Sequence, residues 1–258
     1  MEKSFQVSDV DRKVLGTWTN NPYVALNSLL TRPGLVLNIR SGTKIYQYQQ
    51  LSEADIIRYP KYKSYDDIFQ RLAPIIKMKI FNQPLLDDMV VGHGYAHGYR
   101  VARLVMIESL MRGYTQTRSK ALMLAAFIHD IGRSWANLND ENHGGKSVQL
   151  FTRLLNSDQL TSRLVNERLF NGQLPNITED DIEIIISIVK NHSRSVPEKA
   201  DRLIDSSLVL REVSDESILE DCDALDRIRF KNNLNINFLR NKESFRLFLL
   251  ASKLISLR

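Results

Sequence analysis

Cysteine is almost absent from this sequence, because Cys222 is the single example among 258 residues. One thiol excludes an internal disulfide framework, and it also excludes zinc sites that are built from several cysteines. Long apolar runs are missing too, since no stretch approaches the roughly 18 residues that a transmembrane helix needs. The first residues are charged from Glu2 onward and contain no apolar h-region, so we expect no signal peptide. We therefore expect a soluble, cytoplasmic protein.

Acidic residues are scarce at the end of the chain. Residues 227–258 contain eight lysines and arginines and one acid, Glu243, so their net charge is +7, whereas the preceding residues together carry −2. A basic tail of this kind can bind nucleic acid or an anionic membrane surface. The simpler interpretation, which we favour, is a C-terminal helix that packs the apolar side chains Phe245, Phe248 and Leu249 and leaves its charges in solvent.

The pattern along the chain divides it into three segments, which are residues 1–83, 84–230 and 231–258. In the first segment, GLVLNIRSGTKIYQYQQ predicts two short strands joined by a turn at Ser41-Gly42. The second segment predicts helices over roughly 95–112, 119–131, 143–156, 179–191 and 206–230. We therefore expect a mostly α protein that combines a small N-terminal α+β extension, a helical core and a basic C-terminal helix.

Four of the five histidines share a helical face with apolar neighbours. They are His97, His129, His143 and His192. A single histidine on an apolar face is more often a hydrogen-bonded core residue than a ligand. Four together are different, because burying several unpaired imidazoles costs free energy and a metal ion satisfies them at once. Asp130, which follows His129 at a helix end, adds the anionic ligand that a divalent cation needs.

A second group of carboxylates lies in the stretch ILEDCDALDRIRF. Asp223 comes four residues after Leu219, which places it on the inner side of the last core helix. Asp221 and Asp226 are nearby, but only one carboxylate of the group needs to face inward. We expect Asp221 to be an ordinary solvated acid and Asp223 to face the core.

Taken together, these residues resemble the HD-domain superfamily of metal-dependent phosphohydrolases. HGYRV from His97 is similar to the family's opening motif, and FIHDIGR is similar to its His-Asp doublet. DCDALD is similar to its closing segment, with Cys222 where the family usually has alanine. The resemblance covers about residues 90–230 and implies an HD-type helical bundle around a metal ion. The ligands that it implies are His97, His129, Asp130 and Asp223.

His143 and His192 lie where many members of that family have further histidines. In members with both, these histidines often bind a second metal ion, and in members with one ion they can hold the substrate phosphate. The sequence permits either arrangement, and therefore one ion or two. All candidate ligands are imidazole nitrogens or carboxylate oxygens, so Mg²⁺, Co²⁺, Ni²⁺ and Zn²⁺ are compatible with them, while we favour Mn²⁺ or Fe²⁺.

The expected chemistry is attack of a metal-activated water on phosphorus. Asp130 is the expected catalytic residue at the ion. Developing charge on the phosphoryl group needs cationic neighbours, and we expect them among Arg133, Lys146 and Arg194, each of which has an exposed surface charge as its alternative. His93 precedes the first core helix. We expect it to contact the substrate or to donate a proton to the leaving group, with a plain loop histidine as the equal alternative.

The sequence therefore predicts a metal-dependent phosphohydrolase that acts on a small phosphate ester or anhydride, and a nucleotide is the substrate that we favour. A slightly acidic body suits a small ligand in a helical pocket. Three alternatives stay open: a nuclease of single-stranded nucleic acid, which the basic tail favours, a di-iron oxygenase with the same ligands, and a non-catalytic sensor. The resemblance also allows a homo-oligomer, although the sequence itself does not give the oligomeric state.

Overall fold

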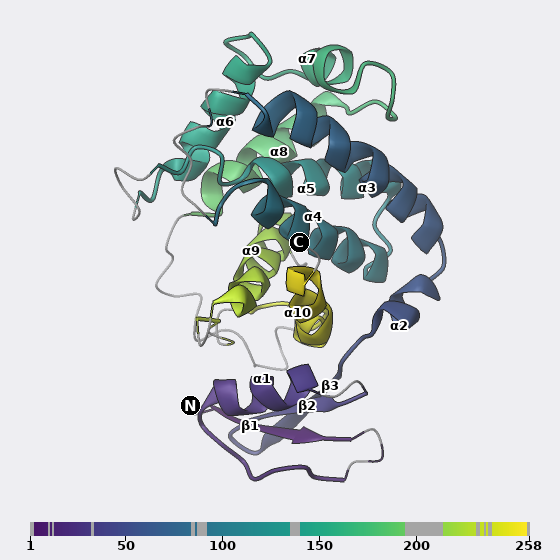
Figure 1. Ribbon diagram of the computed structural model, residues 1–258, viewed down its shortest axis with the longest axis vertical. Coiled ribbons are helices and arrows are strands. Elements are labelled where there is room, and N and C mark those ends of the chain that lie inside the picture. Colours follow the sequence, from purple (N-terminus) through teal and green to yellow (C-terminus); the bar gives the residue numbers. More distant parts are fainter. Residues whose placement is uncertain are drawn as a thin grey trace. The chain divides into compact units, whose positions relative to one another are not determined.

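A computed structural model describes most of the chain (Figure 1). The described residues are 3–9, 11, 13–31, 34–83, 86, 92–134, 140–193, 214–230, 233–234, 236 and 239–256. They form two compact units. The first unit takes the described residues up to Tyr59 and those from Glu220 onward, and the second takes the others. One helix, α9 (Asp215–Asp226), has residues in both units.

The first unit contains an antiparallel sheet in the order β1-β2-β3. Its strands are β1 (Lys3–Ser8), β2 (Val36–Ser41) and β3 (Lys44–Gln49). The predicted turn at Ser41-Gly42 is confirmed, and Gly42 has a φ of +59°, a conformation that favours glycine. Figure 1 shows α1 (Pro22–Thr31) on the sheet. The apolar side chains Leu37 and Ile39 alternate along β2 and are fully buried.

The C-terminal segment belongs to the same unit as the sheet. Helix α10 (Phe248–Ser256) contacts α1, and the Gln50 side-chain amide donates a hydrogen bond of 2.8 Å to the Phe245 carbonyl. Phe245, Phe248 and Leu249 are buried, which confirms the predicted apolar face. The short elements of this unit are α2 (Glu53–Ile57), η6 (Arg227–Arg229) and η8 (Ser244–Arg246).

Several charges of the basic tail are paired within the first unit. Arg229 forms an ion pair with Asp226, and Arg240 forms ion pairs with Glu220 and Asp221. The expectation that Asp221 is solvated is wrong, because this residue is fully buried. Its carboxylate accepts hydrogen bonds of 2.7 Å from the backbone N–H groups of Arg240 and Asn241. Asp221 therefore stabilises the turn that precedes the C-terminal helix.

The second unit is helical, as predicted for the core. Its elements are α3 (Tyr62–Ile76), η1 (Lys77–Phe81), α4 (Tyr95–Met111), α5 (Gln116–Ile128), α6 (His143–Leu154), α7 (Ser162–Leu164), η3 (Val165–Phe170), α8 (Glu179–Asn191) and the first turn of α9. Helix α5 is central, since it contacts α3, α4, α6 and α8 and is buried from Ser119 to Ile128. Within the ranges described here, no helix has both the length and the apolar character that a membrane crossing requires.

Some boundaries differ from those expected. Helix α5 ends at Ile128, so that His129 is its C-cap, because the chain turns at the His-Asp doublet. Helix α9 is described from Asp215, and the part of the predicted helix between 206 and 213 lies outside the described residues. Helix α3 groups with the second unit, although its residues fall within the expected N-terminal segment 1–83. The three-part division at residues 83 and 230 stays a prediction.

Candidate metal centre

All five histidines of the chain converge on one buried carboxylate, that of Asp130. Its side chain is only 5% exposed. The distances from its oxygens are 2.5 Å to His93 Nδ1, 3.5 Å to His97 Nε2, 3.5 Å to His129 Nε2, 3.0 Å to His143 Nε2 and 3.3 Å to His192 Nε2. The residue is therefore the geometric middle of the cluster.

The cluster forms where four helix ends meet. His97 lies in the first turn of α4 and His143 is the first residue of α6, whereas His129 and His192 are the C-caps of α5 and α8. Backbone N–H and C=O groups at helix ends have no partner inside the helix, so they can form hydrogen bonds with side chains of neighbouring elements. The apolar faces predicted for these four histidines place them inside the unit.

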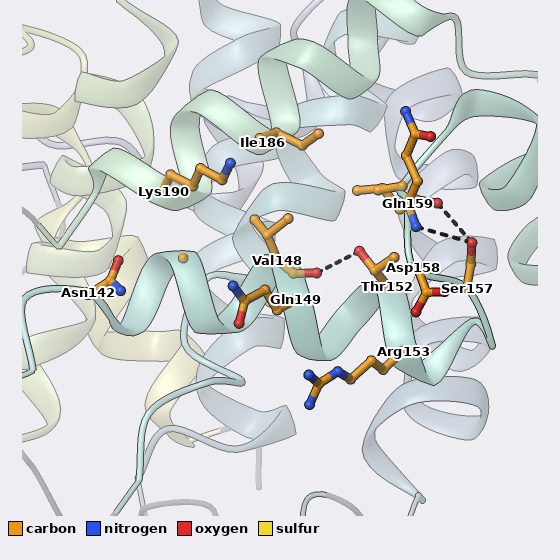
Figure 2. A pocket seen from close by; sticks show the side chains of 12 residues that line it. Asn142, Val148, Gln149, Thr152, Arg153, Ser157, Asp158, Gln159, Ile186 and Lys190 are labelled. Atoms are coloured by element: carbon orange, nitrogen blue, oxygen red, sulfur yellow. Dashed lines mark hydrogen bonds between the residues drawn. The ribbon is translucent and has the colours of Figure 1, made fainter.

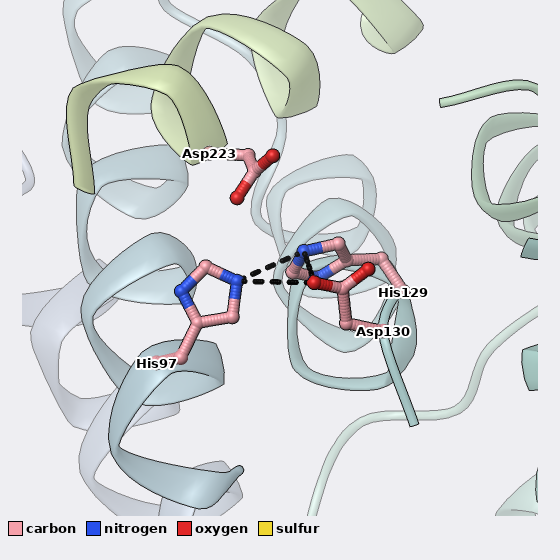
Figure 3. Close-up of side chains that lie close together, drawn as sticks. All are labelled: His97, His129, Asp130 and Asp223. Atoms are coloured by element: carbon pink, nitrogen blue, oxygen red, sulfur yellow. Dashed lines mark hydrogen bonds and ion pairs between the residues drawn. The ribbon is translucent and has the colours of Figure 1, made fainter. Parts of the chain in front are cut away.

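The two oxygens of Asp130 face different groups of histidines. Oδ2 lies near His97 and His129, which with Asp130 offer ligand atoms within 4.8 Å of one another (Figure 3). Oδ1 lies near His143 and His192, and the ligand atoms of these three residues also lie within 4.8 Å of one another. We call these groups the first and the second ligand set. A carboxylate placed this way can bridge two metal ions.

The hydrogen bonds of the rings fit a metal site. The Nδ1 atoms of His129, His143 and His192 lie 2.7, 2.5 and 2.7 Å from the backbone carbonyls of Ala126, Asp140 and Val189. A carbonyl only accepts, so Nδ1 carries the hydrogen and Nε2 of a neutral ring has the lone pair. The Nε2 atoms of His143 and His192 are 3.0 Å apart, and those of His97 and His129 are 3.2 Å apart. Facing lone pairs are stabilised by a cation, and carbonyl-bonded imidazoles are typical metal ligands.

The electrostatics of the cluster favour an ionised carboxylate. Burial raises the pKa of Asp130, but the electrostatic interaction with His129 and the contacts with His143, His192 and His93 outweigh it and hold the pKa well below its ordinary value. Burial lowers the pKa of His93, and its contact with Asp130 opposes this only in part. The centre therefore presents an anionic oxygen pair among imidazoles.

The predicted cationic residues lie in different places. Arg133 reaches the cluster, where NH1 is 3.3 Å from His93 Nε2 and NH2 is 3.3 Å from His143 Nε2. Lys146 is half exposed and forms an ion pair with Asp140. Arg194 lies outside the described residues. Arg133 is thus the predicted cation that this structure brings to the histidines.

Ser147 is a residue of the site that the motif comparison missed. Its hydroxyl donates to the His129 carbonyl at 2.6 Å and accepts from the Gly132 N–H at 2.9 Å. The turn also packs directly on α6, since a Cβ at Gly132 would lie 2.4 Å from the Ser147 backbone nitrogen. The sequence signal for this role is a polar residue, four positions after His143, on a helical face that is otherwise apolar. Ser147 fixes the position of the His129–Gly132 turn against α6.

Replacing Ser147 by alanine is expected to lower the free energy of unfolding by about 1–3 kcal/mol, because a buried N–H and a buried C=O lose their partner. It should also weaken metal binding by roughly 10–100-fold, as removal of groups that orient ligands does. Thermal unfolding and metal titration measure the two effects. The control is Ser109→Ala, because Ser109 is fully buried and its hydroxyl has no hydrogen-bond partner among the described residues. Equal behaviour of the two variants would contradict this role.

Comparison with known proteins identifies the family. A family model for the HD domain matches residues 94–228, slightly more than half of the chain. The match spans α4 to α9 and includes both ligand sets. No significant match was found among curated proteins or among solved structures. The chain therefore belongs to the HD-domain family, which implies chemistry of the metal-dependent phosphohydrolase type.

Proposed function

We propose that this protein hydrolyses a small phosphate ester or anhydride, a nucleotide above all, with the help of one or two divalent metal ions. The observation that carries the proposal is the convergence of five imidazoles and Arg133 on the buried carboxylate of Asp130. Such a donor set binds first-row metals, and we favour Mn²⁺ or Fe²⁺ because no thiolate takes part.

Asp223 completes the first ligand set in this proposal. Helix α9 begins in the second unit, where Asp215 forms an ion pair with Arg118 of α5. Ile218 and Leu219 of the same helix are buried. Asp223 follows Leu219 by about one helical turn, so it lies on the same inward face.

The second ligand set, with His143 and His192, binds either a second ion or the substrate phosphate. A bound ion supplies the acidity that turns water into a nucleophile at neutral pH. Asp130 fixes the position of the two ligand sets relative to each other, because each of its oxygens faces one set. The close approach of Asp130 and His93, at 2.5 Å, orients the carboxylate from the more exposed side.

We propose that Arg133 binds the phosphoryl group. Its Nε is buried and has no hydrogen-bond partner among the residues that the structure describes. It lies 3.7 Å from Asp130 Oδ1, next to the second ligand set. A guanidinium offers several donors in one plane, which matches the oxygens of a phosphate and stabilises charge that develops on them. His93, Lys146 and Arg194 stay predicted contacts of the substrate.

Metal loading followed by a phosphate-release screen tests the proposal. The protein is stripped with a chelator and reloaded separately with each of the six candidate metals. It is then incubated with nucleoside mono-, di- and triphosphates, cyclic dinucleotides and single-stranded DNA or RNA. We expect metal-dependent release from at least one nucleotide, highest with Mn²⁺ or Fe²⁺. Arg133→Ala should reduce this rate, whereas Arg163→Ala, which removes an 83% exposed arginine side chain, should not.

The same screen separates the alternatives. Cleavage confined to single-stranded nucleic acid, with binding that weakens steeply as salt rises, would favour a nuclease. Oxygen consumption by the iron-loaded protein without phosphate release would favour an oxygenase. Metal binding without turnover of any of these compounds would contradict the proposal and favour a sensor.

A further inference from the structure

A cavity of about 690 Å³ lies beside α6 and α8 in the second unit (Figure 2). Sites for small ligands usually enclose about 300–1,000 Å³, so the cavity has room for a metabolite. We call it the α6–α8 pocket. It is lined by Asn142, Gly145, Val148, Gln149, Thr152 and Arg153 of α6 and its start, by Ile186 and Lys190 of α8, and by Ser157, Asp158, Gln159 and Leu160.

This pocket is separate from the metal centre. An α-helix turns by about 100° per residue, so Thr152, nine residues after His143, lies on the opposite side of α6. Lys190 comes two residues before His192 and likewise points away from it around α8. The centre and the pocket therefore lie on opposite sides of the same two helices.

The pocket is rich in hydrogen-bond donors that have no partner. Among the described residues, neither the Arg153 guanidinium nor the Lys190 ammonium forms a hydrogen bond or an ion pair. Figure 2 shows them extending from α6 and from α8. The side-chain amides of Gln149 and Gln159 add further donors, and Asp158 is the one acid in the lining. This balance suits an anion, and phosphate is the anion that arginine and lysine together bind well.

One part of the lining is apolar. Val148 and Leu160 keep 7% and 6% of their surface exposed, and Ile186, which also lines the pocket, is half-buried and presents more. A free inorganic phosphate would leave this surface uncovered, whereas the organic part of a small phosphorylated compound would pack on it. We propose that the α6–α8 pocket binds a small organic phosphate as an effector, at a site separate from the metal centre.

The position of the pocket supplies a route to the centre. The helices that form its walls also carry His143 and His192, whose Nε2 atoms are 3.0 Å apart. A ligand that contacts Lys190 on one wall and Arg153 on the other favours one spacing of α6 and α8. In the spacing that the structure shows, the second ligand set is assembled, so a ligand that selects this spacing favours the assembled set. This coupling between the pocket and the metal centre rests on the proposed function, whereas binding of a ligand to the pocket does not.

Isothermal titration with adenosine 5′-(α,β-methylene)diphosphate, a nucleotide that resists hydrolysis at the bridging position, tests the binding. We expect the Arg153→Gln/Lys190→Gln double variant to raise the Kd of one binding event by about tenfold or more, because it loses charge-assisted contacts. Arg163→Gln/Lys63→Gln removes the same charge from exposed positions outside the pocket and is expected to bind as the wild type does. Inorganic pyrophosphate, which has no organic part, is expected to bind more weakly.

Two results would overturn the proposal. One is unchanged binding by the pocket double variant, which would place the nucleotide elsewhere. The other is the absence of nucleotide binding by the wild type, which would leave the pocket without a ligand of this class. The titration measures binding and no turnover. The result can therefore contradict the pocket proposal while phosphate release supports the proposed function, and it can also support the pocket while phosphate release is absent. Metal titration with and without the nucleotide then measures the coupling, which is expected to tighten metal binding in the wild type and not in the pocket variant.

Discussion

Replacing Asp130 by asparagine is expected to remove metal from both ligand sets and to reduce phosphate release by more than the roughly 100-fold that loss of an orienting partner costs. The amide is nearly the same size as the carboxylate but is neutral, and its NH₂ group cannot serve as a ligand. Since the two oxygens of Asp130 face different sets, one substitution affects both. Metal content per protein and initial rates of phosphate release measure the effect.

The matched control is Asp67→Asn, an exposed acid on α3 in the same unit. It makes the same chemical change and should leave metal content and rate unaltered. Circular dichroism establishes that both variants are folded. An Asp130→Asn protein that keeps its metal and turns over within about twofold of the wild type would remove the basis of the proposed function. Loss of the metal from one set alone would show that Asp130 does not bridge.

Replacing Gly144 by alanine is expected to destabilise the second unit by about 1–3 kcal/mol or more, the usual cost of overpacking a tight contact. A Cβ at this position would lie 2.0 Å from the Val189 carbonyl oxygen and 3.1 Å from His192 Nδ1. That carbonyl also accepts the hydrogen bond that orients the His192 ring. The backbone must therefore shift, and His192 moves with it. Urea unfolding measures the stability, and metal titration measures binding to the second ligand set.

Gly145→Ala is the control for this prediction. Both glycines lie in the first turn of α6, so alanine gives each variant the same gain in helix propensity, up to about 1 kcal/mol. The nearest atoms to a Cβ at Gly145 belong to the side chain of Asn142, with Oδ1 closest at 2.7 Å, and that side chain can rotate away. We expect Gly145→Ala to be neutral or slightly stabilising. A Gly144→Ala protein of equal or higher stability would contradict the close packing of α6 and α8.

Local patterns in the sequence predicted the helical part of this fold well. Helices α4 and α8 begin where expected and end within one residue of the predicted position, because apolar periodicity and end signals are properties of neighbouring residues. The inward direction of His97, His129 and His143 followed from the same periodicity, and all three are buried. The family could also be inferred, because each of its motifs consists of neighbouring residues and the three motifs keep their order along the chain.

Features that depend on distant residues could not be predicted. Strand β1 pairs with β2 more than 25 residues later, and the short alternation in KSFQVS alone does not reveal that partner. Asp221 looked like a surface acid, because its two backbone donors come from residues 19 and 20 positions away. His93 lies before a helix and has no periodicity to orient it, although the structure brings it to Asp130. In each case the missing information is a contact between segments that the chain does not keep adjacent.

The first unit combines residues up to Tyr59 with residues from Glu220 onward, and this has a consequence for biosynthesis. Gln50 bonds to the Phe245 carbonyl, and the Leu51 N–H donates to the Arg246 carbonyl at 2.9 Å. A ribosome makes β3 long before it makes those partners, and contacts so distant in sequence form slowly. The residues of α3 to α8 are complete in the meantime. The helical unit can therefore fold first during translation, whereas the core of the sheet stays incomplete until Phe245 and Arg246 have been made.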